Sequence, residues 1–342
     1  MSGSIITAEI SEIPAVFQKL NRSTAIFDKT VAEIKKRAVS NVILLARGTS
    51  GHAALFLKAL IETELGLPVG IAAPSAVSIN SAKLKFPNTL VIALSQSGQS
   101  PDLLSYLEAA KSGGALVITM TNDANSPMAK LADIHIDLLA GKERALAATK
   151  SYSAQLFAAL KLIRSWQGKS NDFAEASDRL SELLSDNQIT DALITKIANF
   201  KNLVFIGREY GFANAREGAL KIQETCYRFV QGYSAADYVH GPMAAVDTES
   251  CVFVISPAGS PEKGLSKAVI ATRERGAKII WVGSGGFSQG DEVVIDGATT
   301  NDEALNCVID ASLLQILAVK LALQLGHNPD VSRGLEKVTL TF

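Results

Sequence analysis

The 342-residue sequence is poor in cysteine and in aromatic side chains, and it has no excess of charge of either sign. Its three cysteines, Cys226, Cys251 and Cys307, are isolated and odd in number, so neither a disulfide framework nor a zinc site is expected. The formal net charge is −1, from 33 basic and 34 acidic side chains. This balance argues against a nucleic-acid-binding surface and a polybasic membrane patch. We therefore expect a small molecule or a second copy of the chain as the partner.

Long apolar stretches are also missing. No apolar run reaches the ~18–20 residues that would span a bilayer, because Lys, Asp, Gln or Arg interrupts every helical pattern. The first residues, MSGSIITAEISEIP, include acidic side chains and lack the basic and apolar regions of a signal peptide. Together with the unpaired cysteines, these features predict a soluble, cytoplasmic protein with no membrane segment.

What the sequence does contain is an internal repeat. Sliding it against itself by 161 positions aligns the segment from Asn41, NVILLARGTSGHAALF, with the segment from Asn202, NLVFIGREYGFANARE. At the same offset residues 90–95 meet residues 251–256. In each half, short β-rich runs alternate with longer helical patterns, which is typical of βαβ units on a parallel sheet covered on both faces. We therefore predict an α/β fold used twice.

The predicted elements follow one plan in both halves. Strands are expected near residues 42–46, 69–73, 90–94, 116–120 and 134–137, and again near 203–206, 252–255, 278–282 and 292–295. Helices are expected near 51–65, 77–84, 101–112, 126–131 and 148–166, and again near 212–229, 240–245, 261–275 and 303–325. The domains then divide as an N-terminal helical segment (1–30), a first domain (31–166), a helical connector (167–195), a second domain (196–326) and a C-terminal tail (327–342).

The segment LVIALSQSGQSPDLLSYLEAA, from Leu90, is the most informative one. An apolar strand ends, a loop rich in hydroxyl groups follows, and a helix is expected to begin at Pro101 with Ser100 as its N-cap. A helix N-terminus preceded by Gly and hydroxyl donors, at the carboxyl end of a parallel strand, is suited to bind a phosphate dianion. An ordinary capped turn is the alternative. The loop consists of Ser95, Gln96, Ser97, Gly98, Gln99 and Ser100, and its density of polar side chains favours a ligand.

A second turn of this kind follows the first strand. In RGTSG, Gly48 permits close backbone approach, and Thr49 and Ser50 offer hydroxyl groups at the start of the next helix. A plain N-cap is again the alternative. The sequence has no GxGxxG pattern and no Gly-rich loop ending in Lys-Ser or Lys-Thr, which argues against a dinucleotide or a P-loop nucleotide. The equivalent residues 208–211 and 257–260 have lost most hydroxyl donors, so one phosphate site per chain is expected.

The second half carries charged residues instead. Glu217, Lys221 and Glu224 are spaced i, i+4 and i+7, which places them on one helical face. A solvated stripe is the ordinary explanation of such a pattern. His240 precedes a Gly-Pro turn, and Lys337 precedes the final apolar run. An isolated His or a terminal Lys is usually structural or solvated, so the residues alone leave these roles open.

Seven segments nevertheless occur in an order and spacing that resemble the isomerase half of glucosamine-6-phosphate synthase, a tandem pair of sugar isomerase (SIS) domains. The resemblance extends over nearly the whole chain and implies two flavodoxin-like domains, each a parallel five-stranded sheet with helices on both faces, in a homodimer. The segments are residues 48–50, 95–98, 147–150 and 217–221, then Glu224, residues 240–242 and the tail around Lys337.

By this resemblance, one set of residues binds the sugar phosphate and another performs the chemistry. The binding set is Gly48, Thr49, Ser50, Ser95, Gln96, Ser97, Ser100 and Ala148. Glu224 corresponds to the base that moves a proton between C1 and C2, and Lys221 to its helper for the oxygen protons. His240, from the neighbouring subunit, corresponds to the ring-opening group, and Lys337 to a lysine that forms a Schiff base with the keto sugar. The resemblance implies no metal or redox cofactor.

Some positions depart from the family pattern. The synthase begins with a glutaminase domain whose nucleophilic Cys follows Met, whereas Ser2 follows Met1 here, so glutamine is not expected as the nitrogen source. Gln99 and Ser100 replace Glu and Thr, and Ala148 replaces a Ser. We therefore expect a glucosamine-6-phosphate deaminase that releases fructose 6-phosphate and ammonia, in which Lys337 need not form a Schiff base. The alternatives are a fructosamine 6-phosphate deglycase, a galactosamine-6-phosphate deaminase, or a non-catalytic sensor of a sugar phosphate.

Overall fold

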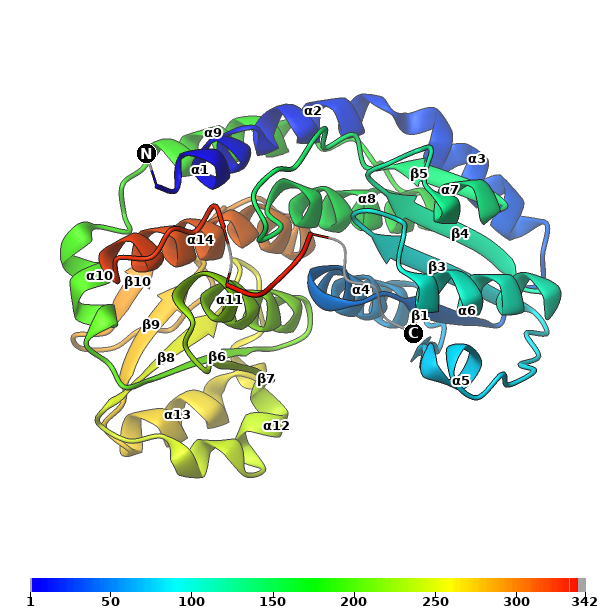
Figure 1. Cartoon of the computed structure of the whole chain (residues 1–342). Coiled ribbons are helices and arrows are strands. Elements are labelled where there is room, and N and C mark those ends of the chain that lie inside the picture. Colours follow the sequence, from blue (N-terminus) through cyan, green and yellow to red (C-terminus); the bar gives the residue numbers. More distant parts are fainter. Residues whose placement is uncertain (1, 332, 338–342) are drawn as a thin grey trace. The chain divides into compact units, whose positions relative to one another are not determined.

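The computed structural model describes residues 2–331 and 333–337, which form two compact units, each built around one sheet (Figure 1). The first-sheet unit takes in residues 15–142, 154–174 and the described residues from 335 onward. The second-sheet unit takes in residues 2–14, 143–153 and the described part of 175–334. Both sheets are parallel and five-stranded, which confirms the predicted α/β fold.

The first sheet has the strand order β2-β1-β3-β4-β5, and all of its strand pairs are parallel. Every residue of β3 and β4 is buried, as expected of central strands covered by helices on both faces. The strand order reverses between β1 and β3, and ligands of open parallel sheets usually bind at the carboxyl ends of the strands beside such a reversal. The strands are β1 (Asn41–Leu45), β2 (Val69–Ile71), β3 (Thr89–Ser95), β4 (Leu116–Thr121) and β5 (Ile134–Asp137).

Helices connect these strands. Helix α4 (Gly48–Leu60) leads from β1 toward β2, and α6 (Pro101–Ser112) leads from β3 to β4. Because the two connections run toward opposite sheet edges, right-handed crossovers place α4 and α6 on opposite faces. The apolar face of α6 packs on β3 and β4 in one buried cluster. The remaining helices before residue 170 are α1 (Ser4–Ser11), α2 (Ile13–Arg22), α3 (Thr24–Lys35), the π-turn Ile61–Leu65, α5 (Ser75–Ser78), α7 (Pro127–Leu131) and α8 (Lys150–Gln167).

The second sheet repeats this topology with the order β10-β9-β8-β6-β7. Helices α11 (Tyr210–Cys226) and α14 (Glu303–Gln324) pack together on one face, and α12 (Ala235–Val239) and α13 (Ser266–Glu274) cover the other (Figure 1). The strands are β6 (Asn202–Gly207), β7 (Gln231–Ser234), β8 (Ser250–Ile255), β9 (Lys278–Val282) and β10 (Val293–Ile295). The other helices are α9 (Glu175–Ser185), α10 (Asp191–Ala198), and the 3-10 turns Pro242–Ala245 and Glu262–Gly264.

The repeat is also visible in the backbone of the turns. Gly48 and its counterpart 161 positions later, Glu209, both have a left-handed φ, of 51° and 48°. Gly98 and Gly259, related by the same offset, have φ of 63° and 96°. Glycine adopts such angles without strain, whereas a residue with a β-carbon does not. The positive sign of φ at these turns is therefore the same in both halves, even where the second half has Glu209 in place of a glycine.

Three local predictions were wrong or incomplete. Strand β7 and helix α12 were missed because the strand sequence, QGYS, has no apolar run. It forms because Gly232 lets the strand approach α11, where a β-carbon would lie 2.4 Å from the Ala215 carbonyl oxygen. The helix predicted at 77–84 is only the single turn α5, since Ser81 adopts a left-handed φ of 51°. The helical connector contains α9 and the start of α10, and the domain boundaries stay a prediction.

Helix α14 is long and apolar enough to cross a membrane by length and composition, which the sequence prediction had not recognised. The charged side chains at Asp310 and Lys320 do not lower its hydropathy enough to exclude it. However, 89% of its most apolar window is buried inside the protein, in contact with α11 and α10. We therefore assign α14 as a core helix of the second-sheet unit.

The buried carboxyl of Asp310 on α14 predicts a pH dependence of stability. Its Oδ1 accepts the Ala298 N–H at 2.7 Å, while its Oδ2 has no hydrogen-bond partner among the described residues. Burial raises the pKa of Asp310 from 3.8 to about 8, so between these values the folded state holds a proton that the unfolded chain has released. This group therefore destabilises the fold progressively as pH rises toward 8, by up to about 1.4 kcal/mol per pH unit.

Asp310→Asn keeps the acceptor for Ala298 and has no proton to lose. Between pH 6 and pH 8, we expect the variant to lose about 2–3 kcal/mol less unfolding free energy than the wild type does. Urea unfolding at both pH values measures the difference. Equal losses in the two proteins would show that Asp310 does not titrate in this range.

Candidate functional site

All of the predicted binding residues except Ala148 lie at two turns on the carboxyl edge of the first sheet. Strands β1 and β3 pair in parallel, with Leu45 beside Ala93, so the turns that follow them leave the sheet next to each other. The strand order reverses at this position, which is where open parallel sheets usually bind ligands. Gly48 is exposed and Thr49 is half-buried at the start of α4.

Residues 95–100 form a tight turn. The Gly98 N–H donates to Ser95 Oγ at 3.0 Å, and the Gly98 carbonyl accepts the Met128 N–H at 3.2 Å. A β-carbon on Gly98 would lie 2.3 Å from the hydroxyl oxygen of Ser126, so only glycine fits. Gln96 and Ser97 are half-buried and remain partly accessible to solvent. The predicted order of a strand, a polar loop and a helix that begins at Pro101 is therefore confirmed.

Ser50 and Ser100 differ in what their hydroxyl groups do. Ser50 is buried, and its Oγ accepts a hydrogen bond of 2.9 Å from Gln155 Nε2 on α8, which leaves the hydroxyl proton to donate. Ser100 is the N-cap residue of α6, as predicted, but its side chain makes no capping hydrogen bond. The capping contact comes instead from Asp102, whose Oδ1 accepts the Leu103 N–H at 2.9 Å. The Ser100 hydroxyl is therefore not committed to the helix.

A charged pair that the sequence prediction missed joins the two turns. Arg47 donates from Nε and Nη2 to Asp102 Oδ2, at 2.9 and 2.8 Å. The Arg47 side chain is 50% exposed, whereas that of Asp102 is completely buried. The two residues are 55 positions apart in the chain, so only the fold reveals their pairing. The pair fixes the first turn of α4 to the first turn of α6.

In the second-sheet unit, α11 brings together the three charged residues predicted to share a face. Lys221 Nζ lies 3.3 Å from Glu217 Oε1 and donates a short hydrogen bond to Glu224 Oε2. The side chains of Lys221 and Glu217 are 1% and 2% exposed, and that of Glu224 is 18% exposed. The ordinary explanation, a solvated charged stripe, is therefore wrong. Glu224 is the member of the set that solvent reaches most readily.

The electrostatics of this set assign a role to each group. Burial disfavours the charge of Lys221, but the carboxylates of Glu217 and Glu224 outweigh it and hold the pKa of Lys221 above its usual value. Lys221 is thus a fixed ammonium ion that orients Glu224 and supplies positive charge. Glu217, to which the resemblance assigned no role, is a buried anion beside Lys221 and keeps it in place. A carboxylate next to such an ammonium is suited to move protons at a carbon adjacent to a carbonyl.

A buried carboxylate also shapes the loop that carries Ala148. Glu143 accepts hydrogen bonds from the Thr149 N–H at 2.9 Å, the Ser151 N–H at 3.1 Å and the Ser151 hydroxyl at 2.6 Å. The Thr149 carbonyl accepts a further bond of 3.2 Å from Gln315 Nε2 on α14. Ala148 is half-buried in this pinned loop. Sequence reasoning missed Glu143, since its partners are mainly backbone groups.

The other two predicted catalytic residues lie outside the α11 set. His240 is exposed at the end of α12, and its N–H donates to the Asp237 carbonyl at 3.1 Å. Lys337 is half-buried and belongs to the first-sheet unit. Within the first-sheet unit most of the binding candidates lie on the two turns, and within the second-sheet unit Lys221 and Glu224 lie together on α11.

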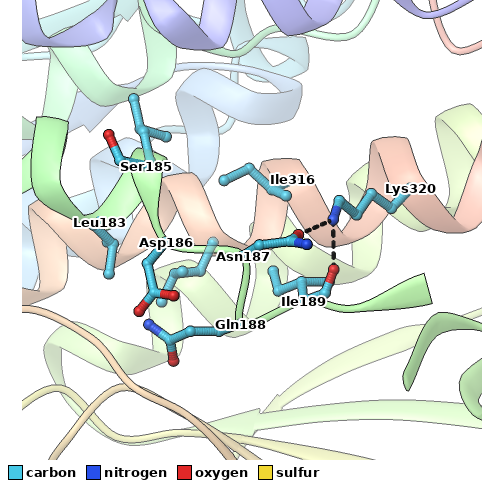
Figure 2. A pocket seen from close by; sticks show the side chains of 10 residues that line it. Leu183, Ser185, Asp186, Asn187, Gln188, Ile189, Ile316 and Lys320 are labelled. Carbon is cyan, nitrogen blue, oxygen red and sulfur yellow. Dashed lines mark hydrogen bonds between the residues drawn. The ribbon is translucent and has the colours of Figure 1, made fainter. Parts of the chain in front are cut away.

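Figure 2 shows a small pocket of about 110 Å³ in the second-sheet unit, between the segment after α9 and helix α14. Lys320 Nζ points into this segment and donates to Asn187 Oδ1 at 2.7 Å and to the Ile189 carbonyl at 2.6 Å. These bonds use the ammonium group to hold the connector on α14. None of the predicted site residues lines this pocket.

We next consider whether the described residues could bind a metal ion or supply a reactive thiol. Over residues 2–331 and 333–337, no group of three or more His, Cys, Asp or Glu side chains is arranged to hold a metal ion. All three cysteines are free and buried. Burial raises the pKa of Cys226 to about 11 and that of Cys251 to about 12, and it also raises the pKa of Cys307. The described thiols are therefore protonated at neutral pH.

Comparison with family models matches the SIS domain to residues 37–165 and 196–323, which is most of the chain. The glutamine–fructose-6-phosphate aminotransferase (isomerizing) of Thermotoga maritima is 31% identical over 319 residues, covering 89% of this chain and 52% of that protein. The enzyme of the same name from Symbiobacterium thermophilum is 33% identical over 321 residues, covering 88% and 52%. The chain thus spans about half the length of the curated relatives it matches.

Solved structures show the same fold. A candidate phosphosugar isomerase from Silicibacter pomeroyi is 29% identical, with a TM-score of 0.86 over 96% of this chain and 100% of that one. The glucosamine-6-phosphate deaminase of Thermotoga maritima is 24% identical, with a TM-score of 0.75 over 97% and 99%, which is a likeness of fold. These matches confirm the resemblance inferred from the motifs.

Proposed function

Because the chain belongs to the SIS domain family of phosphosugar isomerases, we propose that it converts glucosamine 6-phosphate and water into fructose 6-phosphate and ammonia. The observation that carries this proposal is the ion set on α11, in which a buried ammonium ion orients a carboxylate that solvent reaches. Such a set is suited to proton transfer between neighbouring carbons. The polar turns of the first sheet would bind the phosphate through Gly48, Thr49, Ser50, Ser95, Gln96, Ser97 and Ser100, and Ala148 would contact the sugar.

The proposed reaction uses acid–base chemistry throughout. His240 opens the pyranose ring to the C1 aldehyde. Glu224 removes the C2 proton and returns a proton to C1, so that the aldehyde becomes an alcohol and the C2 amine becomes an imine. Lys221 stabilises the negative charge that develops on O1. Water then adds to C2, and ammonia leaves as the C2 ketone forms.

In the proposed reaction the nitrogen comes from the substrate, and none of the three cysteines in this chain is suited to release it from glutamine. Release of ammonia from glutamine by a cysteine needs a reactive thiolate, and burial keeps Cys226, Cys251 and Cys307 protonated. In the deaminase reaction the substrate supplies the nitrogen of the imine. Lys337 then has no need to form a Schiff base, and an electrostatic contact with the sugar is the role we assign to it.

A substrate panel tests the proposed function. We expect equal amounts of ammonia and fructose 6-phosphate from glucosamine 6-phosphate. Ammonia from galactosamine 6-phosphate alone would reassign the sugar, and turnover of fructosamine 6-phosphate would indicate a deglycase. Thermal stabilisation by these sugars without any turnover would indicate a sensor.

We further propose a homodimer in which His240 acts on the sugar bound to the neighbouring subunit, which its exposure permits. His240→Ala and Glu224→Gln chains, each inactive alone, should then recover about a quarter of wild-type activity when unfolded and refolded together in equal amounts. Half of the dimers would be mixed, and each would hold one complete site. Size-exclusion chromatography checks the dimer, and absence of any recovery would place His240 in its own subunit's site.

A further inference from the structure

The segments that form the two polar turns of the first sheet contain a single Lys or Arg side chain. Arg47 is the only Lys or Arg in residues 41–57 and 88–110, which supply β1, β3 and both turns. It stands directly before Gly48, as the N-cap residue of α4, and its side chain is half exposed. Of the Lys and Arg residues, Arg47 is therefore the one that these segments offer to a phosphate dianion bound at the two turns.

Asp102 makes such a cation necessary. It is completely buried in the first turn of α6, at the helix end to which the phosphate site is assigned. A carboxylate there interacts favourably with the helix dipole, but it would repel a dianion approaching the same amide groups. Arg47 offsets that charge by donating to one oxygen of Asp102 from two nitrogens. The guanidinium keeps a third nitrogen, Nη1, with two further N–H donors.

We propose that Arg47 is a phosphate-binding residue, held in position by Asp102, and that it makes this site select phosphorylated over unphosphorylated sugars. The inference rests on the proposed function, in which the two turns bind the sugar phosphate. Arg47 contacts the phosphate, and Asp102 is a positioning residue that acts through Arg47. Planar, forked recognition is what distinguishes Arg from Lys at such sites.

The second half of the chain supplies the matched control. Arg208 occupies the equivalent position, 161 residues later, and is exposed. The residue equivalent to Asp102 is Lys263, so the forked ion pair cannot form, and Glu209 replaces Gly48. In that turn the Ser260 hydroxyl is hydrogen-bonded to Glu303 Oε1 at 3.0 Å. The second turn thus lacks both the forked ion pair and the glycine of the first, which fits one phosphate site per chain.

The test compares the binding of inorganic phosphate, by calorimetry, to full-length wild type, Arg47→Gln, Arg47→Lys and Arg208→Gln. Glutamine can still donate to Asp102 and so keeps the two turns together, but it carries no charge. We expect Arg47→Gln to weaken phosphate binding about 10- to 100-fold, as loss of a charged hydrogen bond does. Arg47→Lys should lose less than Arg47→Gln, and Arg208→Gln should bind like the wild type.

The kinetics separate binding from a structural role. With the sugar phosphate as substrate, Arg47→Gln should raise the KM by a similar factor while the kcat stays within a few-fold. Wild-type phosphate affinity in a folded Arg47→Gln protein would overturn the proposal, and so would equal losses in Arg47→Gln and Arg208→Gln. A wild-type chain that binds no phosphate would overturn it too. Phosphate binding without ammonia release contradicts only the proposed deaminase.

Discussion

Replacing Glu224 by glutamine should lower the kcat of ammonia release by about 10²–10⁴ and change the KM only a few-fold. Glutamine has the shape of glutamate, and its carbonyl oxygen can still accept the hydrogen bond from Lys221. It cannot take up the C2 proton. The partial exposure of Glu224, beside a buried Lys221, is what places the base where a substrate can reach it.

Two measurements make this result specific. Turnover in D₂O should place deuterium at C1 of the fructose 6-phosphate made by the wild type, because the proton returned by the base exchanges with solvent. Glu108→Gln, at an exposed glutamate of α6, serves as the matched control and should retain full activity. If Glu224→Gln kept the wild-type kcat, another group would have to be the base.

The sequence predicted those strands and helices that have a clear local pattern of apolar residues. The central strands β3 and β8 are continuous apolar runs, and the repeat relates one half to the other. Strand β7 could not be predicted, because its formation depends on the close contact between Gly232 and α11. The apolar character of α14 was underestimated, since Asp310 interrupts it in sequence but is itself buried.

In the candidate site, too, some features could be predicted from residue spacing, and others depend on tertiary contacts. Spacing alone predicted that Glu217, Lys221 and Glu224 share a face, but only packing shows that two of them are buried as an ion pair. The two hydrogen bonds from Arg47 to Asp102 join segments that are far apart in the sequence. Sequence periodicity predicts which residues are neighbours within one helix or strand. The contact between Arg47 and Asp102 depends instead on the packing of different elements against each other.

Lys221→Met should destabilise the protein by about 3–5 kcal/mol, because it removes the ammonium ion that neutralises the buried carboxylate of Glu217. Glu224 is less affected, since its side chain is partly solvated. Urea unfolding at neutral pH measures the loss. Lys320→Met is the matched control on the neighbouring helix α14, because its partners are the neutral Asn187 side chain and the Ile189 carbonyl. It should cost about 1–2 kcal/mol.

The double variant Glu217→Gln/Lys221→Met separates charge from packing. It removes the buried negative charge of Glu217 together with the positive charge of Lys221, so most of the stability lost in Lys221→Met should return. Ammonia release should not return, since Glu224 would still lack the ammonium ion that orients it. A double variant as unstable as Lys221→Met would mean that the side chain of Lys221 stabilises α11 by packing. Recovery of stability without activity would instead show that the buried charge of Glu217 causes the loss in Lys221→Met, and that a folded protein without this ion pair cannot release ammonia.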